Sequence, residues 1–229
     1  MSHNFIKRII TSIILLSLLI FINFSHNYVF ILSILILGMI ICIEANNLFS
    51  KILIKKYPKY NAILNTYNIK FIILNLVSFC YIFFIFCNLS YEIHETKGPV
   101  FFLYVISICF FTDIGGYFFG KIIGGKKLSK ISPNKTISGT VGSFLLSMVP
   151  LIIVLNINFL DFKLNLTNIV FCLLISLISQ LGDLFISFIK RKANTKDTGN
   201  VLPGHGGVLD RLDGIIFAVP FSYFLLKLI

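Results

Sequence analysis

The stretch "TNIVFCLLISLISQLGDLFISFIK", Thr167 to Lys190, combines a long apolar run with a single acidic residue. It is long enough to cross a bilayer as a helix, which takes about 20 mainly apolar residues. Asp183 lies within this run, where a charged side chain is costly unless it faces protein or water. The stretch therefore predicts a membrane-spanning helix with a functional group inside it.

The residues after Asp183 extend this interpretation. Ser187, Lys190 and Arg191 follow at i+4, i+7 and i+8, so all four residues share one helix face. At about 1.5 Å per residue, Asp183 lies roughly 10 Å below Lys190, which marks the cytoplasmic edge. An acid beneath a hydroxyl and two cations predicts the wall of a polar funnel that opens to the cytoplasm. The simpler alternative is an aspartate paired with a lysine from another helix.

The composition of the whole chain indicates an all-α polytopic integral membrane protein. Its 229 residues are 57% apolar and 13% charged, and its mean hydropathy is +0.93. An average soluble domain is about half apolar and about a quarter charged. Two regions are predicted, N-terminal membrane helices over 1–98 and a catalytic membrane region over 99–229. Seven spans are expected, at about 9–24, 28–44, 69–89, 99–120, 138–160, 167–189 and 213–229.

The distribution of basic residues predicts the orientation of these spans. The net charge is +11, and all of the 20 basic residues except Lys97, Lys163 and Lys227 lie at the N-terminus or after the second, fourth and sixth spans. Because Lys and Arg gather on the cytoplasmic side, the N-terminus is expected in the cytoplasm and the C-terminus outside. The charge is thus explained by a membrane and not by nucleic acid. The first apolar run has no small-x-small cleavage site and is expected to remain as a span.

Two further acidic residues lie at or within predicted spans. Glu44 ends the second span in "CIEANN" and is expected to mark the membrane interface, with a functional role as the alternative. Asp113, in "FFTDIGGYFFGKIIGGKK", is either a buried polar partner or a substrate-binding residue. Gly116, Gly120 and Gly124 repeat every four residues, which predicts a smooth face for a neighbouring helix.

The connector "GGKKLSKISPNKTISGTVGS", residues 124–143, combines lysines, hydroxyls and glycines. A helix is expected to start near Ser138. Backbone N–H groups at a helix start bind anions, and Lys135 and Thr136 lie beside this one. The connector is therefore a candidate anion site.

The connector "KDTGNVLPGHGGVLDRLDG", residues 196–214, is almost entirely polar although it lies between two apolar spans. A turn containing Gly206 and Gly207 would let backbone approach a ligand closely. Carboxylates suit magnesium and cations suit phosphate, so a metal-bound polyphosphate is the expected ligand. Zinc at His205 is disfavoured because no Cys or His lies nearby. The charged residues are Lys196, Asp197, Asp210, Arg211 and Asp213.

Residues 187–213, "SFIKRKANTKDTGNVLPGHGGVLDRLD", resemble the signature of the phosphatidate cytidylyltransferases, also called CDP-diglyceride synthases. That signature runs S-x-apolar-K-R, four residues, K-D, then a short spacer into P-x-H-G-G-apolar-x-D-R-apolar-D. The chain shows no departure from it. "SPNKTISGTVGS" and "DIGGYFFGKIIGGKKL" also look like family segments, so the resemblance extends over about Thr112 to Asp213.

The resemblance implies that the protein makes CDP-diacylglycerol and pyrophosphate from CTP and phosphatidate, for phospholipid biosynthesis at the cell inner membrane. It also implies a homodimer and a magnesium-dependent di-metal site that faces the cytoplasm. Asp183 and Asp210 would be the principal metal ligands. The residues around them would be Ser187, Lys190, Arg191, Lys196, Asp197 and Asp213.

The residues themselves are compatible with this chemistry, because nucleotidyl transfer needs positioning and charge neutralisation more than a protein nucleophile. Arg211 would neutralise phosphate charge, and His205 has either an acid–base or a turn-stabilising role. Two alternatives stay open: a cytidylyltransferase for another membrane lipid phosphate, and a transporter, which would need polar residues toward both faces. The candidate substrate-binding residues are Asp113, Lys135, Thr136, Ser138, Gly206 and Gly207.

Overall fold

The structure, a computed structural model, describes residues 3–56, 69–129, 132–133, 135–157, 163–202 and 206–228. Within those ranges every regular element is a helix, and the β-structure is limited to two isolated antiparallel bridges. The predicted all-α fold is confirmed for this part of the chain. The helices are α1 (His3–Phe24), α2 (Asn27–Lys56), α4 (Ile69–Cys80), the π-helix η1 (Tyr81–Cys87), α5 (Asn88–Lys97), α6 (Pro99–Ile122), α7 (Ile137–Leu146), α8 (Val149–Ile157), α9 (Leu166–Lys192), α10 (Leu209–Leu212) and α11 (Ile215–Leu228).

Every predicted span overlaps a helix or a run of consecutive helices. In the described residues, five helical segments are long and apolar enough to cross a membrane: Asn27–Leu53, Ile69–Lys97, Pro99–Ile122, Ile137–Ile157 and Leu166–Lys192. The apolar part of α1 is shorter, and α11 has 14 residues with Pro220 inside it. The structure therefore supports a polytopic membrane protein with five such segments, and the count of seven stays a prediction.

The contacts divide the chain into two compact units. Unit 1 contains Met1–Tyr91 and Ile189–Leu212, and unit 2 contains Glu92–Phe188 and Asp213–Ile229. The residues after Phe188 up to Leu212 thus group with the N-terminal helices, whereas the division expected from sequence placed them with 99–229. Each unit is described by itself.

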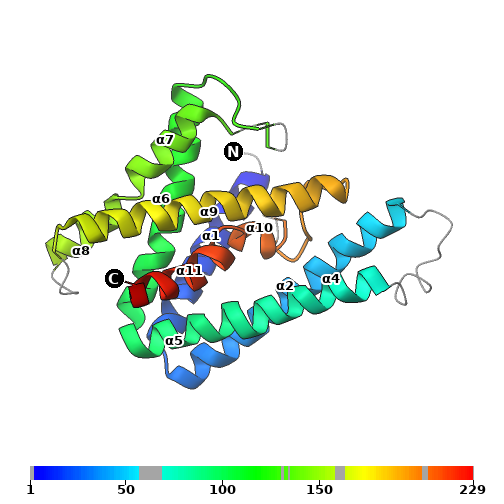
Figure 1. The fold of residues 1–229 in the computed structure, drawn as a ribbon, viewed down its shortest axis with the longest axis horizontal. Coiled ribbons are helices and arrows are strands. Elements are labelled where there is room, and N and C mark those ends of the chain that lie inside the picture. The colour runs from blue at the N-terminus through cyan, green and yellow to red at the C-terminus, as the bar shows by residue number, and fades with distance from the viewer. Residues whose placement is uncertain are drawn as a thin grey trace. The chain divides into compact units, whose positions relative to one another are not determined.

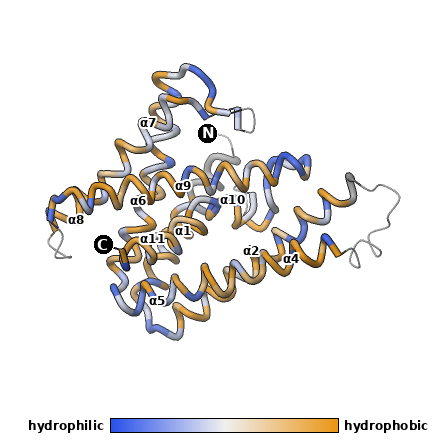
Figure 2. Tube along the Cα trace, viewed as in Figure 1, coloured by the Kyte–Doolittle hydropathy of each residue, from blue (hydrophilic) through white to orange (hydrophobic). Residues whose placement is uncertain are grey.

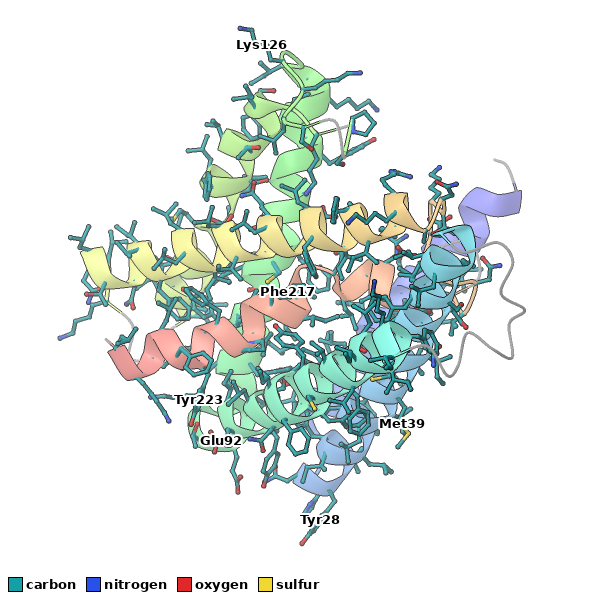
Figure 3. All side chains as sticks on the ribbon, turned by 45° about the vertical axis from the view of Figure 1, so that its right-hand side comes forward. Tyr28, Met39, Glu92, Lys126, Phe217 and Tyr223 are labelled. Carbon is teal, nitrogen blue, oxygen red and sulfur yellow. The ribbon has the colours of Figure 1, made fainter. Side chains whose placement is uncertain are left out.

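In unit 1, α2 packs beside α4 and η1 (Figure 1). The apolar character of α2 and α4 is visible along most of their length in Figure 2. Ile41 and Leu48 are almost fully buried, whereas Met39 is 56% exposed and projects from the helix (Figure 3). Gly38 allows close packing, since a Cβ there would lie 2.8 Å from Cys87 Sγ.

In unit 2, α6 and α7 lie side by side with their backbones in contact (Figure 1). A Cβ at Gly115 would lie 2.8 Å from the carbonyl carbon of Gly142. A Cβ at Gly139 would lie 2.6 Å from the carbonyl oxygen of Gly116. No side chain larger than hydrogen fits at these positions, which is how small residues let helices approach closely in membranes.

The smooth glycine face expected on this helix is confirmed for Gly116 and Gly120, which face the segment Thr136–Ser143. It is wrong for Gly124. That residue lies beyond the end of α6 at Ile122, has φ of +64°, and no atom lies within 4 Å of where its Cβ would be. A turn conformation, and not helix packing, is what Gly124 provides.

Candidate functional site

Asp183 lies on α9 in unit 2 and contacts three polar side chains. Ser187 Oγ donates a hydrogen bond to Asp183 Oδ1 at 3.2 Å, as the i, i+4 spacing predicts. Lys135 Nζ forms an ion pair with Asp183 Oδ2. The Asp213 carboxyl group lies beside Asp183 and interacts with it. The side chains of Lys135 and Asp183 are 28% and 23% exposed. The pairing with a lysine from elsewhere, expected as the simpler alternative, is thus present together with the predicted serine.

The connector between α6 and α7 positions Lys135. It folds back on itself through a bridge between Lys127 and Thr136, in which Leu128 N donates to Lys135 O at 2.8 Å. Helix α7 begins at Ile137, one residue from the expected start. Lys135 therefore directly precedes the N-cap of a membrane helix.

The two hydroxyl residues of this connector stabilise the helix start. Thr136 is the N-cap, and its Oγ1 accepts from Gly139 N at 3.1 Å. Ser138 Oγ donates to Gly124 O and lies 3.0 Å from Thr136 Oγ1. One backbone donor of the predicted anion site is thus used by Thr136.

Two glycines bring Asp213 next to Asp183, and sequence reasoning missed both. A Cβ at Gly182 would lie 2.8 Å from Asp213 O, and a Cβ at Gly214 would lie 2.9 Å from Ser179 O. Helix α9 therefore approaches the start of α11 at backbone distance. The available signal was that each glycine directly neighbours an aspartate, in "LGD" and "LDG".

Asp210 lies in unit 1, and both oxygens of its carboxylate accept hydrogen bonds from protein groups. Lys190 Nζ donates to Asp210 Oδ1 at 2.8 Å, while the N–H groups of Thr198 and Gly207 donate to Oδ2 at 2.7 and 3.0 Å. The Lys190 and Asp210 side chains are 11% and 7% exposed. Burial raises the pKa of Asp210, but the hydrogen bonds from Lys190 and the two N–H groups outweigh it and hold the net pKa below the ordinary value.

The turn that contains Gly206 explains the glycine there. Gly206 has φ of +87°, a conformation that favours glycine, and its carbonyl accepts from Leu202 N at 2.9 Å. A Cβ would lie 3.0 Å from Asp210 Oδ2 and 3.3 Å from Asp197 Cβ. The predicted close approach of backbone is therefore made to Asp210 and Asp197. His205 lies outside the described residues.

Glu44 is a residue of this region whose role sequence reasoning did not establish. Glu44 is 2% exposed within unit 1, so it packs against protein, and its place at the membrane interface stays a prediction. It accepts hydrogen bonds from Thr198 Oγ1 at 2.6 Å and from the N–H groups of Val208 and Leu209 at 2.9 Å each. No local pattern gives this contact, since its partners lie more than 150 residues further along the chain.

The other predicted residues lie on exposed surfaces. Asp113 is exposed on α6, and Lys196 and Arg211 are exposed in unit 1. Arg191 Nη1 donates to Thr195 O at 3.4 Å at the end of α9, a hydrophilic region in Figure 2. All three cations are exposed to the surroundings of the protein.

The oxygen atoms around Asp183 have the chemistry to hold a magnesium ion. Magnesium is usually bound by one or two carboxylates together with substrate phosphates. Asp183 and Asp213 provide two adjacent carboxyl groups, and a bound cation would offset the repulsion between two carboxylates. Among the described residues no group of three or more His, Cys, Asp or Glu forms a cluster, so the remaining ligands would be substrate oxygens and water.

Comparison with known proteins gives consistent matches. The sequence model described as "Cytidylyltransferase family" matches residues 58–229. The chain is 41% identical over 135 residues to the phosphatidate cytidylyltransferase of Bacillus subtilis (strain 168), and 44% identical over 135 residues to that of Staphylococcus aureus (strain COL). These alignments cover 58% of this chain and 50% and 51% of the two proteins. The chain therefore spans about half the length of the curated relatives it matches.

Proposed function

Because the chain belongs to the cytidylyltransferase family, we propose that it transfers the cytidylyl group of CTP to phosphatidate, which gives CDP-diacylglycerol and pyrophosphate. The main supporting observation is the cluster around Asp183, where Lys135, Ser187 and Asp213 contact one carboxylate on a membrane helix. The similar proteins of Bacillus subtilis and Staphylococcus aureus are named phosphatidate cytidylyltransferases.

In the proposed reaction a phosphate oxygen of phosphatidate attacks the α-phosphorus of CTP. The new oxygen–phosphorus bond forms as the bond to the β-phosphate breaks, and pyrophosphate leaves with that electron pair. Such a transfer depends on positioning and on neutralising charge. Lys135 is suited to bind phosphate because it is partly exposed and its carboxylate partner, Asp183, also belongs to the cluster.

The exposed cations of unit 1 would assist in the same way. Arg191, Lys196 and Arg211 are exposed, and guanidinium and ammonium groups hold phosphate oxygens by charge-assisted hydrogen bonds. Lys190 instead is paired with Asp210. We therefore assign the first three to phosphate neutralisation and Lys190 to the position of Asp210.

Magnesium is the proposed cofactor, with a second ion of unassigned identity. Asp183 and Asp210 are the proposed ligands, and Asp213 is added because its carboxyl group lies beside Asp183. When bound, the ion would polarise phosphate oxygens and neutralise charge on the leaving pyrophosphate. Ser187 keeps the Asp183 carboxylate oriented through its hydrogen bond.

The proposed membrane arrangement has seven spans, a polar funnel, a cytoplasmic N-terminus and an outer C-terminus, in a homodimer at the cell inner membrane. The five helical segments of sufficient length and the positions of the basic residues support it. It can be tested by thiol labelling of an Asn200→Cys variant whose five native cysteines are replaced. We expect labelling only from the cytoplasmic side, and labelling only from outside would reverse the orientation.

The reaction is tested with purified, detergent-solubilised full-length protein, radiolabelled CTP and phosphatidate, with and without magnesium. We expect a lipid-soluble cytidylate product that depends on the metal and disappears after chelation. A parallel assay replaces phosphatidate with a polyprenyl phosphate. Product formed only with the polyprenyl phosphate would show that the substrate is a lipid of another class. If neither lipid gives a lipid-soluble product, the proposed cytidylyltransferase activity is refuted.

A further inference from the structure

Glu44 is a buried acid to which the proposed reaction assigns no role. It lies on α2, outside the residues that match the family, and is 2% exposed. Burying a carboxylate costs free energy unless hydrogen bonds satisfy it. The side chain receives three such bonds, and all three donors belong to the segment 198–209.

The geometry requires both carboxylate oxygens. Oε1 accepts from Val208 N, while Oε2 accepts from Leu209 N and from Thr198 Oγ1. The side-chain amide of a glutamine at this position would place an N–H₂ group, itself a donor, against the donors of one of the two oxygens. Glutamate fits in part because Gly199 and Gly207 have no side chain, since a Cβ would lie 2.9 Å from Glu44 Oε1 at Gly199 and 2.8 Å from Glu44 Cδ at Gly207.

One of these donor residues, Thr198, also connects Glu44 to Asp210. Thr198 Oγ1 lies 2.6 Å from Glu44 Oε2 and 3.0 Å from Asp210 Oδ2, and Thr198 N donates to that Asp210 oxygen at 2.7 Å. A hydroxyl has a single proton, and the shorter distance directs it to Glu44. Glu44 therefore fixes Thr198, whose backbone in turn binds Asp210.

We infer that Glu44 is a positioning residue, which anchors the segment 198–210 to α2 and thereby sets the position of the Asp210 carboxylate for nucleotidyl transfer. This role rests on the proposed reaction. The hydrogen bonds of Glu44 go to the protein, so its effect passes through Thr198 and through the backbone at Val208 and Leu209. The N-terminal helices thus contribute to the site although the family match begins after them.

The anchor can be measured without any assay of activity. Hydrogen–deuterium exchange of the peptide 206–212 is compared in wild type, Glu44→Gln and the matched control Glu95→Gln, an exposed residue of α5. We expect exchange to accelerate on the order of tenfold in Glu44→Gln and to be unchanged in the control. Equal exchange in all three proteins would overturn the anchor.

The positioning role is measured by kinetics. We expect Glu44→Gln to lower kcat about tenfold while the KM for CTP changes less than about threefold. Thr198→Val removes the hydroxyl and should lower kcat similarly, whereas Thr198→Ser keeps it and should restore kcat to within about twofold of wild type. The serine rescue separates lost positioning from a general loss of packing.

Each remaining outcome is decisive. Turnover in Glu44→Gln equal to that in Glu95→Gln would overturn the positioning role even if exchange accelerates. If Glu44→Gln fails to fold, equal kcat in the valine and serine variants of Thr198 would overturn it instead. A wild-type protein that forms no product would refute the proposed reaction and with it the positioning role, while the exchange comparison still decides whether Glu44 anchors the segment.

Discussion

Asp183 and Asp210 are two acids with the same side chain and opposite surroundings. The Asp183 side chain is 23% exposed, and the partners described above are side chains: Lys135, Ser187 and Asp213. The Asp210 carboxylate is 7% exposed, and two of its donors are backbone N–H groups. Side-chain partners can rotate toward a ligand, whereas backbone donors are fixed by the fold.

The difference separates two uses of a carboxylate. Asp183 can exchange a partner for a substrate or metal with little change in backbone structure. Asp210 would have to leave a buried ion pair with Lys190, and leaving such a pair unmatched is strongly unfavourable. We therefore expect the chemistry to depend most directly on Asp183, and the folded shape of the segment 198–210 to depend on Asp210.

The largest effect is expected for Asp183→Asn. The variant loses the charge that pairs with Lys135 and would bind magnesium, so kcat/KM should fall about 100-fold or more. Thermal unfolding in detergent should change little. Product formation from labelled CTP measures the first effect, with Glu95→Gln as the control, and near-normal turnover would show that Asp183 is not in the site.

Asp210→Asn should lower activity and, unlike Asp183→Asn, should also lower the stability of the fold substantially. It leaves the buried Lys190 ammonium without its counter-charge, which costs about 3 kcal/mol. Differential scanning fluorimetry in detergent should give a clearly lower unfolding temperature than for Asp183→Asn. Equal unfolding temperatures in the two variants would remove the distinction between the two acids.

Lys135→Ala should lower kcat/KM about tenfold, because one of the cations proposed to neutralise the phosphates is lost. The control is Lys126→Ala, a lysine at the exposed tip of the same connector (Figure 3). Steady-state kinetics with CTP as the varied substrate compare the two. An equal loss in both variants would indicate general attraction of the anion instead of a specific contact.

The smallest effect concerns pH. The pKa of Asp210 is lowered in the folded protein from an ordinary value of 3.8, so its ionised form stabilises the fold fully above that value. This stability is lost as pH falls through the lower, folded pKa. The difference in unfolding temperature between wild type and Asp210→Asn should be constant from about pH 8 to 5 and shrink below about pH 4. A difference that already shrinks near neutral pH would contradict the lowered pKa.

Local features of the site follow from the sequence. The placement of Ser187 beside Asp183 is confirmed because helical spacing alone determines it. The start of α7 is confirmed to within one residue, since Thr136 is a strong N-cap. Most helix positions follow from apolar runs of span length, which are likewise local signals.

Contacts between residues far apart in the chain could not be predicted from the sequence. The burial of Glu44 depends on donors more than 150 residues away, and a single acid after an apolar run looks the same whether it faces headgroups or a loop. The approach of Gly182 to Asp213 depends on how two helices pack, which no periodicity encodes. Gly124 was misassigned because its four-residue spacing continues past the residue where α6 ends.

The contact between α6 and α7 limits which sequences this protein can accept. With the Gly139 and Gly116 backbones too close for a Cβ, even alanine at Gly139 would push the two helices apart. Such a shift would move the first turn of α7, and with it Lys135, which lies two residues before that helix begins, without any change at the lysine itself. A mutational screen for inactive variants should therefore recover glycine-to-alanine changes at the α6–α7 contact as often as changes that remove a charged side chain of the site.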